Sequence, residues 1–291
     1  MPTLDEIRMF AKYHLVRRVV DHPAPETSMG IVPLDYDADA YAETIRSFGD
    51  RFEVSTLAEV EYQGRAHPIL EVRVAAEVPR QKLLVLAGVH GNEHAGLLAV
   101  PEILERLAED RPPDVELRII TPVNPVGAAQ LSRYNARGFD INRDFLRFET
   151  PEAQVVRRVV EATRPDFVIS LHEGPQDATF MFSNRWVPEP LIHAALEAME
   201  AGGTRLATED YFGSKLDPPG HSPMGRGGWL LSAVWGATLR MMATGMWLDG
   251  RGVPELTLES SWRLPSREQR VRGHVDLVLA VTRALSAAAG A

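Results

Sequence analysis

The sequence has no cysteine, no excess of basic residues and no long uninterrupted apolar segment. Its 291 residues include 31 Lys and Arg against 40 Asp and Glu, which gives a formal net charge of −9. Without cysteine, the chain can form neither disulfides nor thiolate metal sites nor a catalytic thiol, so any transition metal must be held by His, Asp or Glu. The acidic balance argues against nucleic acid and anionic membranes as partners and favours a small soluble substrate.

Neither a secretion signal nor a membrane span is recognisable. Residues 1–20 carry acidic side chains early and lack the apolar core of a signal peptide. No later segment is long and apolar enough to cross a bilayer. We therefore expect a cytoplasmic protein without membrane partners, and the sequence does not indicate its oligomeric state.

What the sequence does contain is an alternation of strand-like and helix-like segments. Residues 52–74 are typical of a hairpin that turns at Gln63-Gly64. Continuous apolar runs within 82–89, 115–121, 167–171 and 256–258 indicate strands buried on both faces. Helical spacing of apolar residues is found over 95–108, after the Thr150-Pro151 start, and after a capping box formed by Ser266 and Gln269.

This order of elements predicts an α/β fold. We expect a mostly parallel, open, twisted sheet with helices on both faces and the N-terminal hairpin at its edge. No repeat or low-complexity tract divides the chain. We therefore expect a single domain over residues 1–291, with residues 1–50 as an N-terminal helical extension packed on it.

Titratable side chains follow three of the predicted strands. His90 and Glu93 come after the first, His172 after another and Glu259 after a third. The carboxyl ends of strands in an open α/β sheet meet where ligands bind. Two histidines and one carboxylate are a recurring ligand set of catalytic zinc. The sequence thus predicts one Zn²⁺ per chain on His90, Glu93 and His172, with Gly91 relaxing the turn between the first two.

Other interpretations of these residues remain open. A histidine at a strand end is more often simply hydrogen-bonded, and Glu93 could be an acid that favours a helix dipole. His90-x-x-Glu93-His94 also matches an inverted zincin pattern, which requires His90 inside a helix and leaves His172 and Glu259 without roles. Cobalt, nickel or manganese could occupy the same ligands. A nucleotide-binding loop is disfavoured, because its glycine spacing and its lysine are absent.

Two polar loops are further candidates. Residues 133–143 (RYNARGFDINR) place guanidinium groups among Asn, Asp and Gly. Arginine offers a planar fork that matches carboxylates and a developing oxyanion, although composition alone favours a solvated loop. Residues 217–228 contain His221 and Arg226, and form either a specificity loop over a pocket or an inert surface excursion.

Taken together and in order, these motifs resemble the zinc carboxypeptidases of the M14 type and their relatives, the succinylglutamate desuccinylase and aspartoacylase group. The resemblance covers most of the chain. It lies in His-Gly-Asn-Glu at 90–93, Arg-x-Asn-x-x-Gly-x-Asp-x-Asn-Arg at 133–143, the histidine at 172 and Thr-Leu-Glu at 257–259. Carboxypeptidases of this type usually carry a tyrosine before the catalytic glutamate, whereas here Tyr211 is the last tyrosine before Glu259.

The resemblance implies a role for each residue around the metal. His90, Glu93 and His172 would be the zinc ligands. Asp140 matches the aspartate that orients a ligand histidine, a support that metal-bound histidines usually have. Arg133 would polarise the scissile carbonyl.

The implied activity is hydrolysis of an amide bond. Asn142 and Arg143 would grip a substrate carboxylate, and Glu259 would be the general base. This favours a metallocarboxypeptidase that removes a C-terminal residue, with a deacylase of N-acyl amino acids as the alternative. A hypothesis of another class is a metal- or carboxylate-binding module without turnover. The expected partner is a small molecule or short peptide with a free carboxylate.

Overall fold

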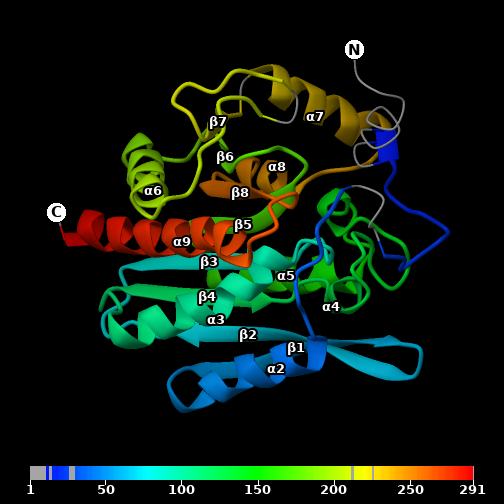
Figure 1. Ribbon diagram of the computed structural model, residues 1–291, viewed down its shortest axis with the longest axis horizontal. Helices are drawn as coiled ribbons and strands as arrows, with labels where there is room; N and C mark the ends of the chain where they lie inside the picture. Colours follow the sequence, from blue (N-terminus) through cyan, green and yellow to red (C-terminus); the bar gives the residue numbers. More distant parts are fainter. Residues whose placement is uncertain (1–10, 13–14, 26–29, 211–212, 225, 291) are drawn as a thin grey trace.

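The computed structural model describes residues 11–12, 15–25, 30–210, 213–224 and 226–290. Its centre is an eight-stranded mixed sheet with the strand order β1-β2-β4-β3-β5-β8-β6-β7 (Figure 1). The expected N-terminal helix falls largely outside the described residues, as does Tyr211. The strands are β1 (Glu53–Tyr62), β2 (Arg65–Val74), β3 (Gln81–Ala87), β4 (Val115–Thr121), β5 (Phe167–Gly174), β6 (Phe180–Ser183), β7 (His221–Pro223) and β8 (Glu255–Ser261).

The α/β prediction is confirmed. Strands β4, β3, β5 and β8 run parallel in the middle of the sheet. β1 and β2 form an antiparallel hairpin at one edge, and both Gln63 and Gly64 at its turn have positive φ. The sequence analysis did not identify β6 and β7 at the other edge, where β6 runs antiparallel to β8.

Helices cover both faces of the sheet. On one face, α2, α3, α6 and α9 pack around residues such as Ile45, Ile103 and Val278. On the other face, α5 and α8 pack around Val156 and Trp247. The bounds are α2 (Ala38–Ser47), α3 (His94–Glu109), α4 (Pro125–Ala129), α5 (Pro151–Thr163), α6 (Glu189–Ala201), α7 (Arg226–Thr238), α8 (Thr244–Asp249) and α9 (Arg267–Gly290), with short 3₁₀ helices η2 (Phe48–Asp50) and η3 (Ile141–Arg143).

Local sequence explains where the main helices begin. The hydroxyl of Thr150 accepts a hydrogen bond from the backbone N–H of Ala153, and Pro151 occupies the first helical turn of α5, as predicted. At the start of α9, the hydroxyl of Ser266 accepts from the N–H of Gln269. Because α5 lays its valines on the sheet, each buried one contributes about 1.5–3 kcal/mol.

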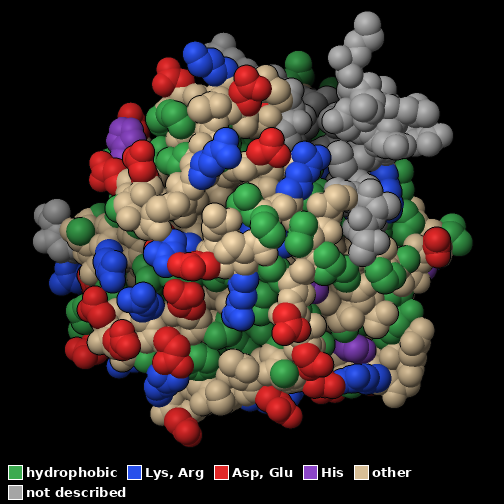
Figure 2. All heavy atoms as spheres, in the orientation of Figure 1, with side chains coloured by type: hydrophobic (Ala, Val, Ile, Leu, Met, Phe, Trp, Pro, Cys, Tyr) green, Lys and Arg blue, Asp and Glu red, His purple; other side chains and the backbone are tan. Residues whose placement is uncertain are grey.

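On the face shown in Figure 2, acidic and basic side chains are interspersed. Within the described residues, no helix combines the length and the apolar character that crossing a membrane requires.

Candidate metal centre

The candidate site lies where three neighbouring parallel strands end. His90 is the third residue after the end of β3, whereas His172 and Glu259 lie in the last part of β5 and of β8. β3 pairs with β5 and β5 pairs with β8, and His172 is in register with Glu259. The adjacency of these strands therefore delivers the predicted residues to one edge of the sheet.

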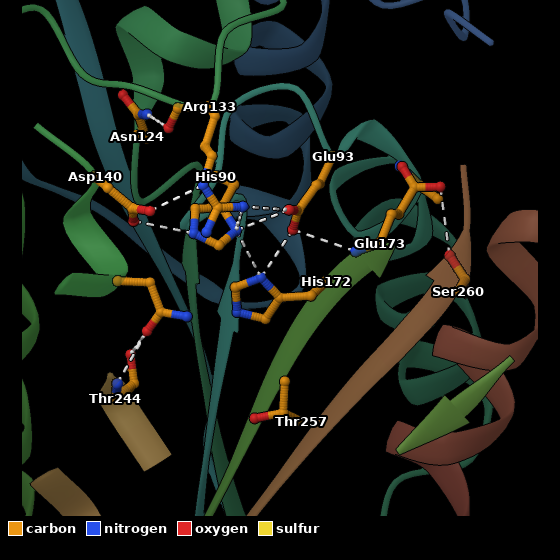
Figure 3. Close-up of polar contacts among 12 residues, drawn as sticks. His90, Glu93, Asn124, Arg133, Asp140, His172, Glu173, Thr244, Thr257 and Ser260 are labelled. Carbon is orange, nitrogen blue, oxygen red and sulfur yellow. Dashed lines mark hydrogen bonds and ion pairs between the residues drawn. The ribbon is translucent and has the colours of Figure 1, made fainter. Parts of the chain in front are cut away.

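Three of these residues converge on a single buried point (Figure 3). His90 Nδ1 lies 2.7 Å from one carboxylate oxygen of Glu93, and His172 Nδ1 lies 2.8 Å from the other. The two Nδ1 atoms are 3.1 Å apart, and one ligand atom from each residue falls within 4.8 Å of the others. Two imidazoles and a carboxylate directed at one point fit a divalent transition metal.

Asp140 and Arg133 hold one side of this cluster. Asp140 Oδ1 lies 3.2 Å from His90 Nε2, and its Oδ2 accepts a 2.8 Å hydrogen bond from Arg133 Nε. Burial alone would raise the pKa of Asp140, but the charges of Arg133 and His90 lower it overall. Asp140 is therefore a carboxylate that fixes the His90 ring. Arg133 Nη1 reaches to 3.5 Å from Glu93, so the guanidinium lies beside the cluster.

The protonation states match those that metal ligation requires. Burial would raise the pKa of Glu93, yet the charges of His90 and His172 more than offset this and lower it. Burial lowers the pKa of His172. An ionised carboxylate and a neutral imidazole are the forms that bind a metal.

Glu259 lies next to the cluster. Among the described residues, its carboxylate forms no hydrogen bond or ion pair, and the residue is 9 % exposed. Burial first, and then the charge of Glu93, raise the pKa of Glu259. A Cβ on Gly174 would lie 3.3 Å from Glu259 Oε2, so the glycine leaves space beside this oxygen. A carboxylate with a raised pKa and no fixed partner is suited to accepting a proton.

Asn142 and Arg143 lie in η3, at the same edge of the sheet. The side-chain oxygen of Asn142 accepts hydrogen bonds from both the N–H (2.9 Å) and the hydroxyl (3.0 Å) of Thr244 at the start of α8. Arg143 is buried and donates to the backbone oxygen of Asn142, with its guanidinium carbon 5.9 Å from the ring centre of Trp235. The charge of Arg143 acts on both Asp140 and Glu259, which places it in the same electrostatic environment.

Behind the cluster lies a buried ion pair that sequence analysis missed. Glu173 follows His172 and therefore points to the opposite face of the sheet. Its carboxylate accepts from Arg270 of α9 at 2.7 and 3.0 Å and from the N–H of Ala95 at 2.9 Å. Its own N–H donates to Glu93 at 3.2 Å. Glu173 thus ties the first turn of α3 to α9 and supports Glu93 from behind.

Gly91 has a different role from the one expected. The sequence suggested that it relaxes the turn after His90, but its φ is not positive. A Cβ at Gly91 would instead lie 2.0 Å from the carbonyl carbon of Gly127 in α4. Glycine is needed because two backbone segments touch here, and this contact between distant residues cannot be seen in a single sequence.

The alternative with His94 is not realised. His90 precedes α3 and lies outside any helix, so the inverted zincin pattern is absent. His94 is buried: its Nε2 lies 3.1 Å from the backbone oxygen of Ala128, and its ring stacks on Tyr36. Burial lowers the pKa of His94 to about 4, so it is a neutral packing residue.

The second candidate loop is only partly described. His221 belongs to the edge strand β7, and its Nε2 lies 2.8 Å from the hydroxyl of Ser183 on β6. Burial lowers the pKa of His221. This hydrogen bond gives His221 a structural partner at the sheet edge. The side chain of Arg226 lies outside the described residues.

Comparison with known proteins finds similar sequences and structures. Residues 79–209 match the succinylglutamate desuccinylase/aspartoacylase catalytic domain. A carboxypeptidase 2 from Trichophyton rubrum is 24 % identical over 168 residues, which is 53 % of this chain and 31 % of that protein. The chain thus spans about a third of the length of the curated relatives it matches.

Solved structures show the same fold. A metallopeptidase-like protein from Shewanella denitrificans OS217 superimposes with a TM-score of 0.65 at 18 % identity, over 87 % of this chain and 95 % of that one. A succinylglutamate desuccinylase/aspartoacylase from Rhodobacter sphaeroides gives a TM-score of 0.54 at 19 % identity, over 87 % and 68 %. The domain match and the shared fold together confirm the resemblance of this chain to the zinc carboxypeptidase superfamily, including its succinylglutamate desuccinylase/aspartoacylase group.

Proposed function

We propose that this protein is a zinc-dependent hydrolase of amide bonds. The observation that carries the proposal is the convergence of His90, Glu93 and His172 on one buried point, with the uncommitted carboxylate of Glu259 on the neighbouring strand. These three residues would hold the metal. When bound, zinc supplies a Lewis acid that acidifies a water molecule and polarises a carbonyl group.

Glu259, Arg133 and Asp140 would each have a separate task in the reaction. Glu259 takes a proton from the attacking water as the water oxygen bonds to the carbonyl carbon. Arg133 donates hydrogen bonds to the carbonyl oxygen as negative charge develops there, a contribution that is typically a few kcal/mol for one donor. Glu259 then returns the proton to the leaving nitrogen as the C–N bond breaks. Asp140 keeps His90 in the tautomer that binds metal through Nδ1.

Two substrate classes share this chemistry. Arg143 carries a buried positive charge beside Asp140 and Glu259, which suits a substrate carboxylate next to the scissile bond. The curated relative and the fold favour a metallocarboxypeptidase, which is our leading assignment. The catalytic-domain match favours an N-acyl amino acid deacylase, whose product bears the same carboxylate.

Mass spectrometry separates these possibilities. Zinc-loaded and chelator-treated protein are incubated with short peptides and, separately, with N-acyl amino acids, and the Glu259→Gln variant serves as the matched control. Metal-dependent loss of C-terminal residues supports the carboxypeptidase, and release of free acyl acids supports the deacylase. If zinc-loaded wild type and Glu259→Gln leave both pools equally unchanged, the hydrolase assignment is wrong and a binding module takes its place.

A further inference from the structure

Glu93 occupies the N-cap position of α3 as well as its place in the metal cluster. The side chain of an N-cap residue ordinarily accepts a hydrogen bond from a backbone N–H of the first helical turn. The carboxylate of Glu93 makes no such bond. Its two oxygens instead lie 2.7 Å from His90 Nδ1 and 2.8 Å from His172 Nδ1. A helix N-terminus and a metal site therefore compete for one carboxylate.

Glu173 accepts the hydrogen bond that Glu93 leaves unmade. Its Oε2 accepts from the backbone N–H of Ala95 at 2.9 Å. Ala95 is the second residue of α3, and its N–H is one that an N-cap side chain normally takes. The start of α3 packs closely on β5, because a Cβ on Gly96 would lie 2.8 Å from the Cβ of Leu171. A residue of β5 can therefore cap α3 from outside the helix.

The carboxylate of Glu173 is fixed from the side away from the metal cluster. Nε and Nη2 of Arg270 donate to its two oxygens at 2.7 and 3.0 Å, which is the bidentate geometry that orients a carboxylate most firmly. The hydroxyl of Ser260 donates to Oε1 at 3.4 Å and lies 2.9 Å from Nε2 of His274. Glu173 and Arg270 are 2 % and 1 % exposed. Groups of α9 and β8 thus hold the cap in place, and water has little access to it.

Glu173 also contacts Glu93 directly through its backbone. Its N–H donates to Glu93 Oε2 at 3.2 Å, the oxygen that lies beside His172. In Figure 3 the two carboxylates turn in opposite directions, that of Glu93 toward His90 and His172 and that of Glu173 toward Ser260. The side chain of Glu173 therefore serves the helix, while its N–H holds Glu93 toward the histidines.

We propose that Glu173 is a positioning residue for the metal ligand Glu93, and that it acts by capping α3 in place of Glu93. With Glu173 present, the carboxylate of Glu93 is left to the metal. Without it, the unpaired N–H of Ala95 and the positive end of the helix dipole attract the carboxylate of Glu93 away from the imidazoles. Arg270 contributes indirectly, because it fixes Glu173. This inference rests on the proposed function, since it concerns the ligands of that metal.

Two double variants separate the cap from the ion pair. Glu173→Gln/Arg270→Met and Glu173→Leu/Arg270→Met both lack the buried ion pair, and neither leaves an unpaired charge. Glutamine keeps an oxygen that can accept from the N–H of Ala95, whereas leucine is of similar size and has no acceptor. In competition with a chelator of known zinc affinity, we expect the glutamine variant to bind zinc about as tightly as wild type. The leucine variant should bind it about 10–100-fold more weakly.

A double-mutant cycle distinguishes this role from a general loss of structure. Glu93→Ala should weaken zinc binding strongly in the glutamine variant but only slightly in the leucine variant, because there Glu93 has already left the metal. If leucine merely disturbed the structure, Glu93→Ala would weaken binding by the same factor in both. Cobalt(II) gives an optical check, since its absorption spectrum should match wild type in the glutamine variant and indicate a lost ligand in the leucine variant.

Urea denaturation first establishes that each variant is folded. If the leucine variant does not fold, Glu173→Ala/Arg270→Met takes its place, because alanine also lacks an acceptor and relieves any overpacking. Equal zinc affinities of the variants with and without an acceptor, or equal effects of Glu93→Ala in both, would overturn the inference and leave the hydrolase assignment intact. If wild type binds neither zinc nor cobalt, the ligand assignment and the proposed function are wrong, and the inference is refuted with them.

Discussion

Replacing Glu255 by glutamine should stabilise the metal-free protein, and the gain should grow with pH. The carboxyl group is buried, and its pKa is raised by burial from 4.5 to about 7. In the unfolded chain this group loses its proton near its ordinary pKa, whereas the folded protein retains it up to about 7. The unfolded state therefore binds fewer protons between these values, and the stability of the wild type falls as pH rises through this window.

The size of the effect follows from the shift. Each pKa unit corresponds to about 1.4 kcal/mol, so complete ionisation of Glu255 costs the folded state about 3 kcal/mol above pH 8. Between about pH 5.5 and about pH 8.5 the change amounts to about 2 kcal/mol. Glutamine keeps a similar shape and cannot ionise, so Glu255→Gln should lack this pH-dependent loss.

Urea denaturation of metal-free wild type and variant at these two pH values measures the difference. Glu116→Gln is the control of opposite sign. Burial would raise the pKa of Glu116, but hydrogen bonds from Arg73 and Arg118 lower it overall. The charged form of Glu116 therefore stabilises the fold at pH values above its ordinary pKa. This control should destabilise the protein by a similar amount at both pH values.

The outcome that refutes the reasoning is specific. If the free energy of unfolding of Glu255→Gln relative to wild type is the same at both pH values, the carboxyl group does not titrate near neutrality. Water or a partner would then solvate it, and its role as an uncompensated buried acid would be lost.

Three further predictions concern the metal centre. Glu259→Gln should lower kcat by about 10²–10⁴-fold with zinc content unchanged by elemental analysis, and loss of zinc would argue that Glu259 is a ligand instead. Zinc at about 100 times its dissociation constant should raise the free energy of unfolding of wild type by about 2.7 kcal/mol. The same zinc concentration should not stabilise His172→Ala. Stabilisation of this variant by zinc would contradict the assignment of His172 as a ligand. Arg270→Met should lower the free energy of unfolding by about 3–5 kcal/mol, because it leaves Glu173 buried and unpaired. In urea denaturation, the double variant with Glu173→Leu should recover part of this loss. Additive losses in the double variant would show that the two residues do not act as a pair.

Much of the fold could be predicted because its central strands are apolar on both faces. The runs at β3, β4 and β5 and the alternating hairpin of β1 and β2 carry their own signals. β6 and β7 contain only four and three residues, too few for a recognisable period. Their place at the sheet edge depends on pairing with β8 and with each other rather than on local sequence.

The residues of the candidate site could be found from their position after buried strands and from ordered motifs. Their convergence is a consequence of strand adjacency, which the α/β pattern already implied. The buried ion pair of Glu173 and Arg270, which lies behind Glu93, could not be predicted in this way. Glu173 and Arg270 are 97 residues apart and meet only because α9 returns to pack beside α3. The need for glycine at position 91 likewise depends on its contact with Gly127, which the sequence alone does not reveal.

The alternation along β8 separates two tasks on one short strand. Glu259 lies at the end of β8 that faces the metal cluster, while Glu255, four residues earlier on the same face, is packed against Gly245 of α8. The chemistry at one end of the strand and the packing of α8 at the other therefore depend on different residues of β8.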